Sequence, residues 1–226
     1  MKFFKFAIIS FIVLNYLALG CATAPSQFSE YPSQPLSRFD RELFARALLH
    51  QQKGQIEPAI VLWNKFLQRN PNSFEVRNNL GSLYYANDEI VKAIYHYNQG
   101  LKLRPREDQL KMNLVRALKV QSAILEENRE YDEAIMGLSR IVELSPPKEK
   151  EGIERQIEAL EDQIFKQVKK SDSMGEYQKF LKKYPRSPGN SDEARLWIEN
   201  KLKAKKMGNQ ESLSSDFQPS PATELR

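Results

Sequence analysis

Residues 88–105, DEIVKAIYHYNQGLKLRP, repeat the pattern of residues 54–71, GQIEPAIVLWNKFLQRNP, at a spacing of 34 positions. A third copy, REYDEAIMGLSRIVELSP, occupies residues 129–146. In every copy an alanine is followed four positions later by a large apolar residue and twelve positions later by a proline. The three sets are Ala59, Trp63 and Pro71; Ala93, Tyr97 and Pro105; and Ala134, Leu138 and Pro146. Self-similarity at a period of this length indicates a stacked-repeat architecture.

The second copy shows why these residue types suit a pair of crossing helices. Ala93 is small, so we expect the second helix of the pair to lie close to the first where Gly81 leaves room. Tyr84 and Tyr97 would fill the space between successive pairs, and Pro105 cannot continue the helix, so the chain turns there. The other packing positions predicted in this copy are Leu80 and Gly100.

These positions carry a resemblance to the tetratricopeptide repeat, a unit of about 34 residues with small residues where its two helices cross. Residues 74–107 resemble the repeat most closely. The first copy departs from it, with Arg46 and Ala47 in place of Leu-Gly and His50 in place of the tyrosine, and Arg77 stands where the family often has tryptophan. The resemblance implies an all-α fold, a tetratricopeptide solenoid of antiparallel helix pairs that ends in a capping helix.

Three tetratricopeptide-like repeats are predicted within residues 38–147, at about 40–73, 74–107 and 108–147. The third is longer, because 41 positions rather than 34 separate Pro105 from Pro146. Apolar residues keep helical spacing throughout the first part of this repeat. The extra length therefore predicts a first helix that is longer by about two turns.

Residues 148–206 lose the motif but keep helical patterning, which predicts a divergent helical repeat and then a capping helix. A single apolar face runs through Ile153, Ile157, Leu160, Ile164 and Val168, and a short coiled coil is the alternative. The stretch EYQKFLKKYPRSP, residues 176–188, resembles the closing helix of divergent repeats in bacterial outer-membrane assembly lipoproteins. The capping helix is predicted to end near Gly208, and the Ser-, Pro- and Gln-rich residues 207–226 to form a disordered tail.

Residues 1–20 have the layout of a secretory signal, with Lys2 and Lys5 followed by a nearly uninterrupted apolar run. The adjoining sequence LALGC, residues 17–21, resembles the lipobox of bacterial lipoproteins. That family prefers leucine three positions before the cysteine and a small residue two before it, whereas this chain has Ala18 and Leu19. The resemblance implies cleavage before Cys21, diacylglycerol on its sulfur and acylation of the new amino terminus. The alternatives are an uncleaved anchor or a plain signal peptide with a chance cysteine.

The Pro-, Ser- and Gln-rich residues 21–37 predict an extended tether between the anchor and the folded chain. In the lipoprotein family, the absence of aspartate just after the cysteine usually accompanies transport to the outer membrane, and Ala22 fits that rule. The resemblance therefore implies a lipid-anchored protein at the periplasmic face of a Gram-negative outer membrane.

The charge and the polar residues narrow the classes of function. The net charge of +5 falls to +3 when Lys2 and Lys5 are removed with residues 1–20, and nucleic-acid binding requires a more concentrated basic stripe. His50 and His96 are the only histidines, and neither has a second ligand at metal spacing. Phosphate-loop and nucleophile motifs do not occur. We therefore expect no enzyme, no metal, no small-molecule substrate and no cofactor apart from the lipid on Cys21.

In tetratricopeptide arrays the first helix of each repeat lines a concave groove. The resemblance assigns eight residues to this groove: Phe44, Glu75, Asn78, Ser82, Tyr85, Met112, Arg116 and Lys119. They could equally be ordinary exposed helix positions, and the Met and aromatic members could be partly core. A known subfamily grips a partner's C-terminal carboxylate at positions that here hold Phe44, Leu48, Asn79, Gln109 and Asn113. Only Asn79 matches, so a clamp of that kind is not expected.

The resemblances together imply a membrane-anchored scaffold or adaptor that binds an extended or helical segment of a cell-envelope protein. Two alternatives remain open from the sequence. One is an assembly or piloting factor for a pilus, a secretin or a β-barrel machine, and the other is a regulator of a cell-wall enzyme.

Overall fold

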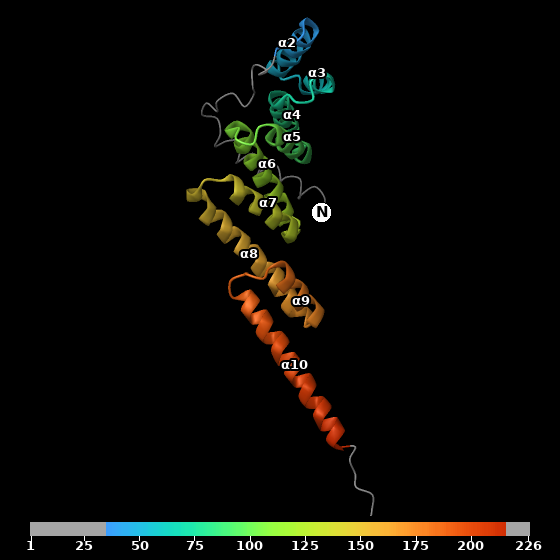
Figure 1. Cartoon of the computed structure of the whole chain (residues 1–226), viewed down its shortest axis with the longest axis vertical. Helices are drawn as coiled ribbons and strands as arrows, with labels where there is room; N and C mark the ends of the chain where they lie inside the picture. Colours follow the sequence, from blue (N-terminus) through green and yellow to red (C-terminus); the bar gives the residue numbers. More distant parts are fainter. Residues whose placement is uncertain (1–34, 216–226) are drawn as a thin grey trace, which may run out of the picture. The chain divides into compact units, whose positions relative to one another are not determined.

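The computed structural model describes residues 35–215, with side chains as far as Met207. The described chain divides into two compact units: an N-terminal unit that ends at Ile124 and a C-terminal unit that begins at Leu125. Every regular element between residues 35 and 215 is an α-helix (Figure 1). The all-α prediction is therefore confirmed.

The helices follow one another with short connections (Figure 1). The N-terminal unit holds α2 (Arg38–Gln52), α3 (Ile56–Arg69), α4 (Phe74–Ala86), α5 (Ile90–Leu103) and most of α6 (Asp108–Glu127). The C-terminal unit holds the end of α6, then α7 (Tyr131–Leu144), α8 (Pro147–Ser171), α9 (Met174–Lys183) and α10 (Asn190–Ser215). In the N-terminal unit α2 packs mainly on α3 and α4 mainly on α5, and contacts between α3 and α4 join the two hairpins.

The turn between the two helices of each repeat has the same backbone conformation in all three copies. Gly54, Asp88 and Arg129 occupy equivalent positions and adopt left-handed φ angles of 69°, 59° and 64°. The next residue in each turn donates its amide hydrogen to a carbonyl five positions back, over 2.8 to 2.9 Å. Only glycine adopts this conformation without strain, yet Asp88 and Arg129 adopt it too. The periodicity seen in the sequence is thus reproduced in the backbone.

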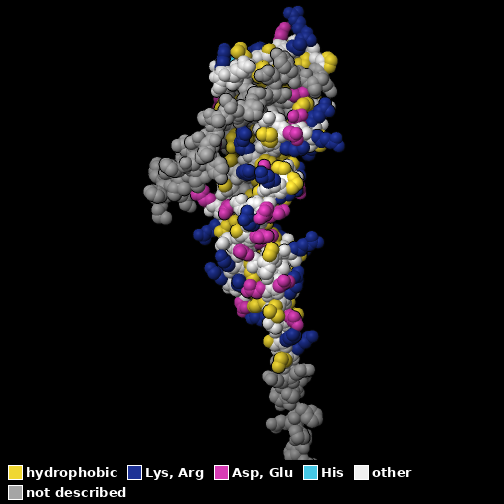
Figure 2. All heavy atoms as spheres, turned by 90° about the vertical axis from the view of Figure 1, so that its left-hand side faces the viewer, with side chains coloured by type: hydrophobic (Ala, Val, Ile, Leu, Met, Phe, Trp, Pro, Cys, Tyr) yellow, Lys and Arg dark blue, Asp and Glu magenta, His cyan; other side chains and the backbone are white. Residues whose placement is uncertain are grey.

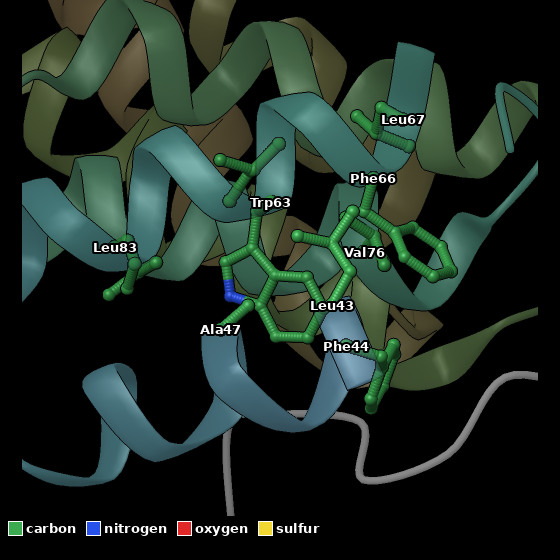
Figure 3. Close-up of a cluster of buried hydrophobic side chains, with 10 residues drawn as sticks. Leu43, Phe44, Ala47, Trp63, Phe66, Leu67, Val76 and Leu83 are labelled. Carbon is green, nitrogen blue, oxygen red and sulfur yellow. The ribbon is translucent and has the colours of Figure 1, made fainter. Parts of the chain in front are cut away.

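The core of the first repeat is an aromatic cluster between α2 and α3 (Figure 3). The Trp63 side chain is fully buried, and its indole N–H donates to the Gln51 side-chain oxygen over 2.9 Å. Phe44 and Phe66 approach the indole edge-to-face, with ring centroids 4.7 and 6.2 Å from it. Ala59 is fully buried beside this cluster, because only a small residue leaves room for the two helices to approach.

Gly81 lies directly against the Tyr97 ring of α5. A Cβ atom at position 81 would lie 2.6 Å from Cδ1 and 2.8 Å from Cζ of the Tyr97 ring. Ala93, on the second helix of the same pair, is fully buried. The same close approach recurs at Gly100, where a Cβ atom would lie 2.8 Å from the Leu110 side chain. Glycine at both positions therefore lets a larger side chain of a neighbouring helix reach the backbone.

Among the other predicted packing positions, the residues within the helices are buried or half-buried and the prolines are exposed. Leu80 and Ala134 are fully buried, and Tyr84 is half-buried with its ring stacked on His96 at a centroid distance of 5.2 Å. The prolines that close the three repeats are exposed: Pro71, Pro105 and Pro146. Their contribution is to end a helix rather than to fill the core.

Helix α6 begins the third repeat and has 20 residues, against 13 in α4, the equivalent helix of the second repeat. The longer connection between Pro105 and Pro146 thus contains additional helix. Asn113, in the second turn of α6, is buried and donates its side-chain amide to the Asn78 side-chain oxygen over 2.9 Å. This hydrogen bond joins the first helices of two successive repeats.

The C-terminal unit has its own core around α8, α9 and α10. Leu160, Phe165 and Val168 are buried on α8, whereas the other three predicted members of its apolar face are half-buried: Ile153, Ile157 and Ile164. The Tyr177 ring of α9 stacks on the Trp197 ring of α10 with a centroid distance of 3.9 Å and an interplanar angle of 2°. These contacts hold the start of α10 against α9.

Helix α10 continues to Ser215, which is past the end predicted near Gly208. Residues 207–215 are therefore helical, and the prediction of a disordered tail is wrong for this stretch. Gly208 does not end the helix because a single glycine costs a helix interior only about 1 kcal/mol. Cys21, the signal segment and most of the tether lie outside the described residues, as do residues 216–226. None of the helices between residues 35 and 215 has the length and apolar character required to cross a membrane.

Candidate functional site

The eight predicted groove residues divide into a buried set and an accessible set. Phe44, Glu75, Asn78 and Ser82 are buried, with at most 5% of each side chain exposed. The accessible set consists of Tyr85, Met112, Arg116 and Lys119, near the C-terminal end of α4 and along α6. Tyr85 and Arg116 are half-buried, Lys119 is exposed and Met112 is 54% exposed. We call these four residues the basic end of the groove.

Phe44 is a core residue, so its assignment to the groove is corrected. Its ring contacts both Trp63 and Phe66 edge-to-face, with centroid distances of 4.7 and 5.5 Å. The positional rule places this residue on the inner face of α2. The rule fixes the face of the helix but not the direction of the ring, and here the ring packs into the hairpin of α2 and α3.

The buried polar residues of the groove form hydrogen bonds within and between helices. Ser82 and Tyr97 bring their hydroxyl oxygens within 3.2 Å, and Asn113 donates to Asn78. The Ser73 hydroxyl donates to Glu75 over 2.9 Å, and the Ser73 oxygen also caps α4 by accepting from the Val76 amide. A buried polar group without a partner costs about 1–3 kcal/mol, so these bonds fix which repeats can stack and in what register.

The positive charge of Arg116 affects the pKa values of two tyrosines at the basic end. Burial raises the pKa of Tyr85, and the Arg116 guanidinium opposes part of that rise. Burial likewise raises the pKa of Tyr97 to about 12, against the opposing effects of the Ser82 hydrogen bond and of Arg116. Both phenols are therefore protonated at neutral pH and available as hydrogen-bond donors. Arg116 is close enough to both rings for its charge to affect them.

Each of the two histidines contacts a side chain of its own repeat. The His50 ring nitrogen Nδ1 lies 2.6 Å from the Gln55 side-chain oxygen, which closes the turn of the first repeat. His96 is buried, stacked on Tyr84 and near the Arg77 guanidinium. Burial, helped by the charge of Arg77, lowers the pKa of His96 to about 4, so this ring is neutral at physiological pH. Within residues 35–207, acids and histidines nowhere gather in a group that could hold a metal ion.

A pocket of about 390 Å³ in the C-terminal unit was not predicted from the sequence. Its lining residues are Asp132, Ile135, Met136, Ser139, Arg140, Glu143, Lys183 and Tyr184. Its charges neutralise one another, since Lys183 pairs with Asp132 over 2.8 Å and Arg140 pairs with Glu143 over 2.5 Å. The Tyr184 hydroxyl also donates to Asp132. Burial acts to raise the pKa of Asp132, but the bonds from Lys183 and Tyr184 outweigh it and lower that pKa. The pocket therefore leaves no unpaired charge for a ligand.

Helical hairpins that pack in sequence, with the same turn conformation at equivalent positions, define a tetratricopeptide-type fold. Solenoids of this class use extended concave surfaces to bind proteins or peptides. The sequence profile described as the tetratricopeptide repeat matches residues 43–73. That span lies in the first repeat, whereas the motif residues of the family are most complete in residues 74–107.

Several solved structures are similar to the chain in fold. MamA is 17% identical over 82% of this chain and 100% of that one, with a TM-score of 0.40. The translocator chaperone SycD of type III secretion from Yersinia enterocolitica is 20% identical over 56% and 86%, with a TM-score of 0.38. The tetratricopeptide domain of Sgt2 from Aspergillus fumigatus is 16% identical over 59% and 84%, with a TM-score of 0.39. At these identities the likeness concerns the helical fold alone. A search of curated proteins finds no match to the sequence.

Proposed function

We propose that the protein is a non-catalytic adaptor of the bacterial cell envelope that binds a segment of another protein along the inner face of α4 and α6. The observation that carries the proposal is the basic end of the groove. There, an exposed methionine, a half-buried tyrosine and two cationic side chains lie together on helices that a buried hydrogen-bond network holds in place. Exposed apolar and aromatic side chains beside cations are typical of surfaces that bind proteins.

The adaptor is proposed to act at the periplasmic face of the outer membrane, attached by a lipid on Cys21. The lipobox-like residues 17–21 and the proline-rich tether support this location. A protein with several acyl chains stays on the membrane, because each buried methylene contributes about 0.8 kcal/mol. The Cys21→Ser chain should therefore move from the membrane fraction to the soluble fraction of host cells. A variant that still sediments with membranes would contradict the lipid anchor and would leave the uncleaved signal as the explanation.

Partner capture from detergent-solubilised host membranes tests the groove. Met112→Glu places a charge on the exposed apolar side chain of the basic end and should reduce capture of the main partner at least about tenfold. Met136→Glu is the matched control, because Met136 is also an exposed helical methionine but lies outside the groove. Capture that is equal for both variants would contradict the groove assignment.

The identity of the captured protein separates the kinds of adaptor. A pilus, secretin or β-barrel subunit would indicate an assembly or piloting factor, and a cell-wall enzyme would indicate a regulator. In both cases the same variant, Met112→Glu, is expected to abolish the interaction.

A further inference from the structure

Arg116 is a half-buried cation without an acid partner in the described part of the chain. Basic and acidic side chains are interspersed on the face shown in Figure 2, and four arginines pair with carboxylates: Arg38 with Glu42, Arg69 with Asp40, Arg140 with Glu143 and Arg195 with Asp192. Arg116 makes no such pair, although it lies on the inner face of α6 where a partly dry surface strengthens electrostatic attraction. An arginine in this setting can offer its planar set of N–H donors to a ligand.

Two tyrosine rings, those of Tyr85 and Tyr97, lie within range of the positive charge of this guanidinium. The Tyr97 hydroxyl is buried and lies 3.2 Å from the Ser82 hydroxyl, while the half-buried Tyr85 ring is within range of the Arg116 charge. Burial keeps both phenols protonated, so the Tyr85 hydroxyl can donate to an anion held by Arg116. Lys119, one turn further along α6 and exposed, adds a second positive charge.

We propose that Arg116, assisted by the Tyr85 hydroxyl, binds the side-chain carboxylate of an aspartate or glutamate in the partner segment. This inference rests on the proposed function and names the chemistry that the groove recognises. The charges fit it: Asp88, whose carboxylate acts on Tyr85, is exposed and forms no ion pair with Arg116 among the described residues.

The position of Arg116 favours an internal side chain over a chain end. Arg116 is near the middle of the 20-residue helix α6, with Met112 one turn before it and Lys119 one turn after it. A segment that contacts both neighbours must continue past Arg116 in both directions. Asn113, one turn earlier, occupies a position that the chaperone-type carboxylate clamp uses, and its side chain is already bonded to Asn78. The two kinds of carboxylate recognition therefore use different residues.

Random dodecapeptides displayed on phage and selected on the full Cys21→Ser chain provide the probe. A selected peptide is synthesised with both ends blocked, by acetyl and amide groups, and again with its acidic residue changed to the amide. We expect the acid-to-amide change to weaken binding to the parent chain about tenfold and binding to Arg116→Gln less than about twofold. Arg106→Gln, which removes an exposed arginine outside the groove, should behave as the parent chain does.

Each outcome bears on a different claim. Equal weakening on the parent chain and on Arg116→Gln overturns the carboxylate site, as does binding that requires an unblocked peptide C-terminus. The groove survives both results if Met112→Glu still abolishes binding. Failure to select any peptide, or unchanged binding to Met112→Glu, overturns the groove and the carboxylate site with it. Arg116→Lys keeps the charge without the planar donor set and should bind with intermediate affinity, which provides a second reading if Arg116→Gln loses helical circular dichroism.

Discussion

Trp63→Ala should lower the free energy of unfolding of the N-terminal unit by about 4 kcal/mol, since truncation of a fully buried tryptophan typically costs 3–5 kcal/mol. The Trp63 side chain has no exposed surface and contacts Phe44 and Phe66. Its loss also leaves the buried side-chain oxygen of Gln51 without its indole donor. Amide hydrogen exchange in α2, α3 and α4 measures the effect locally, which suits a chain with two compact units.

Val61→Ala is the control for Trp63→Ala on the same helix. The Val61 side chain is 65% exposed, so its truncation should change protection by less than about 0.5 kcal/mol. The aromatic core of the first repeat would be contradicted if Trp63→Ala changed the free energy of amide protection in α2 to α4 by less than about 1 kcal/mol.

Gly81→Val should cost the same unit about 3 kcal/mol, at the upper end of the usual cost of overpacking. The new side chain would meet the Tyr97 ring, because even a Cβ atom lies 2.6 Å from its Cδ1. The sequence contains two tryptophans, and only Trp63 lies in the N-terminal unit. Urea unfolding followed by Trp63 fluorescence in a Trp197→Phe background therefore measures this unit alone.

Gly152→Val makes the same change in α8 of the C-terminal unit, and its effect is followed by amide hydrogen exchange in α8 because Trp63 does not report on that unit. Nothing lies within 4 Å of a Cβ atom at Gly152, so this change should be neutral or slightly stabilising, because valine is a better helix former than glycine. The Gly81→Val and Tyr97→Ala double mutant should lose less than the sum of the two single effects, since removal of the ring relieves the clash. Additive losses would show that Gly81 and Tyr97 are not in contact.

The sequence predicts the repeats well because their packing depends on residue size at fixed spacing. Ala59, Ala93 and Trp63 recur at a period set by the helix pair, and all three side chains are fully buried. The turns between helices recur for the same reason, with left-handed residues at equivalent positions. Helix length also follows from the spacing, because extra residues between two prolines with continuous apolar periodicity can only lengthen a helix.

The candidate site is less predictable because a positional rule fixes the face of a helix but not the direction of each side chain. Phe44 turns into the core, where its ring packs edge-to-face on Trp63 and Phe66. Asn78 and Ser82 satisfy the rule, yet they are buried in hydrogen bonds to other helices. Such bonds join residues 35 and 15 positions apart, and no pattern within a single helix reveals them.

Contacts between residues outside the repeat motif are the least predictable from the sequence. The Tyr184 hydroxyl bonds to Asp132, a residue 52 positions away, and a local motif carries no information about such a pairing. The continuation of α10 to Ser215 was missed because glycine and serine read as a helix end, whereas their cost in a helix interior is small.

Site-specific photo-crosslinking in host cells tests most directly whether the inner face of the helices binds a partner segment. A photoreactive amino acid replaces Met112 or Lys119 in the groove, and in separate chains Val61 or Val91, which are exposed on the second helices of their repeats. We expect one crosslinked protein from both groove positions and none of it from Val61 or Val91. Crosslinking of the partner from Val61 or Val91 alone would contradict the account, because the binding surface would then lie on the second helices.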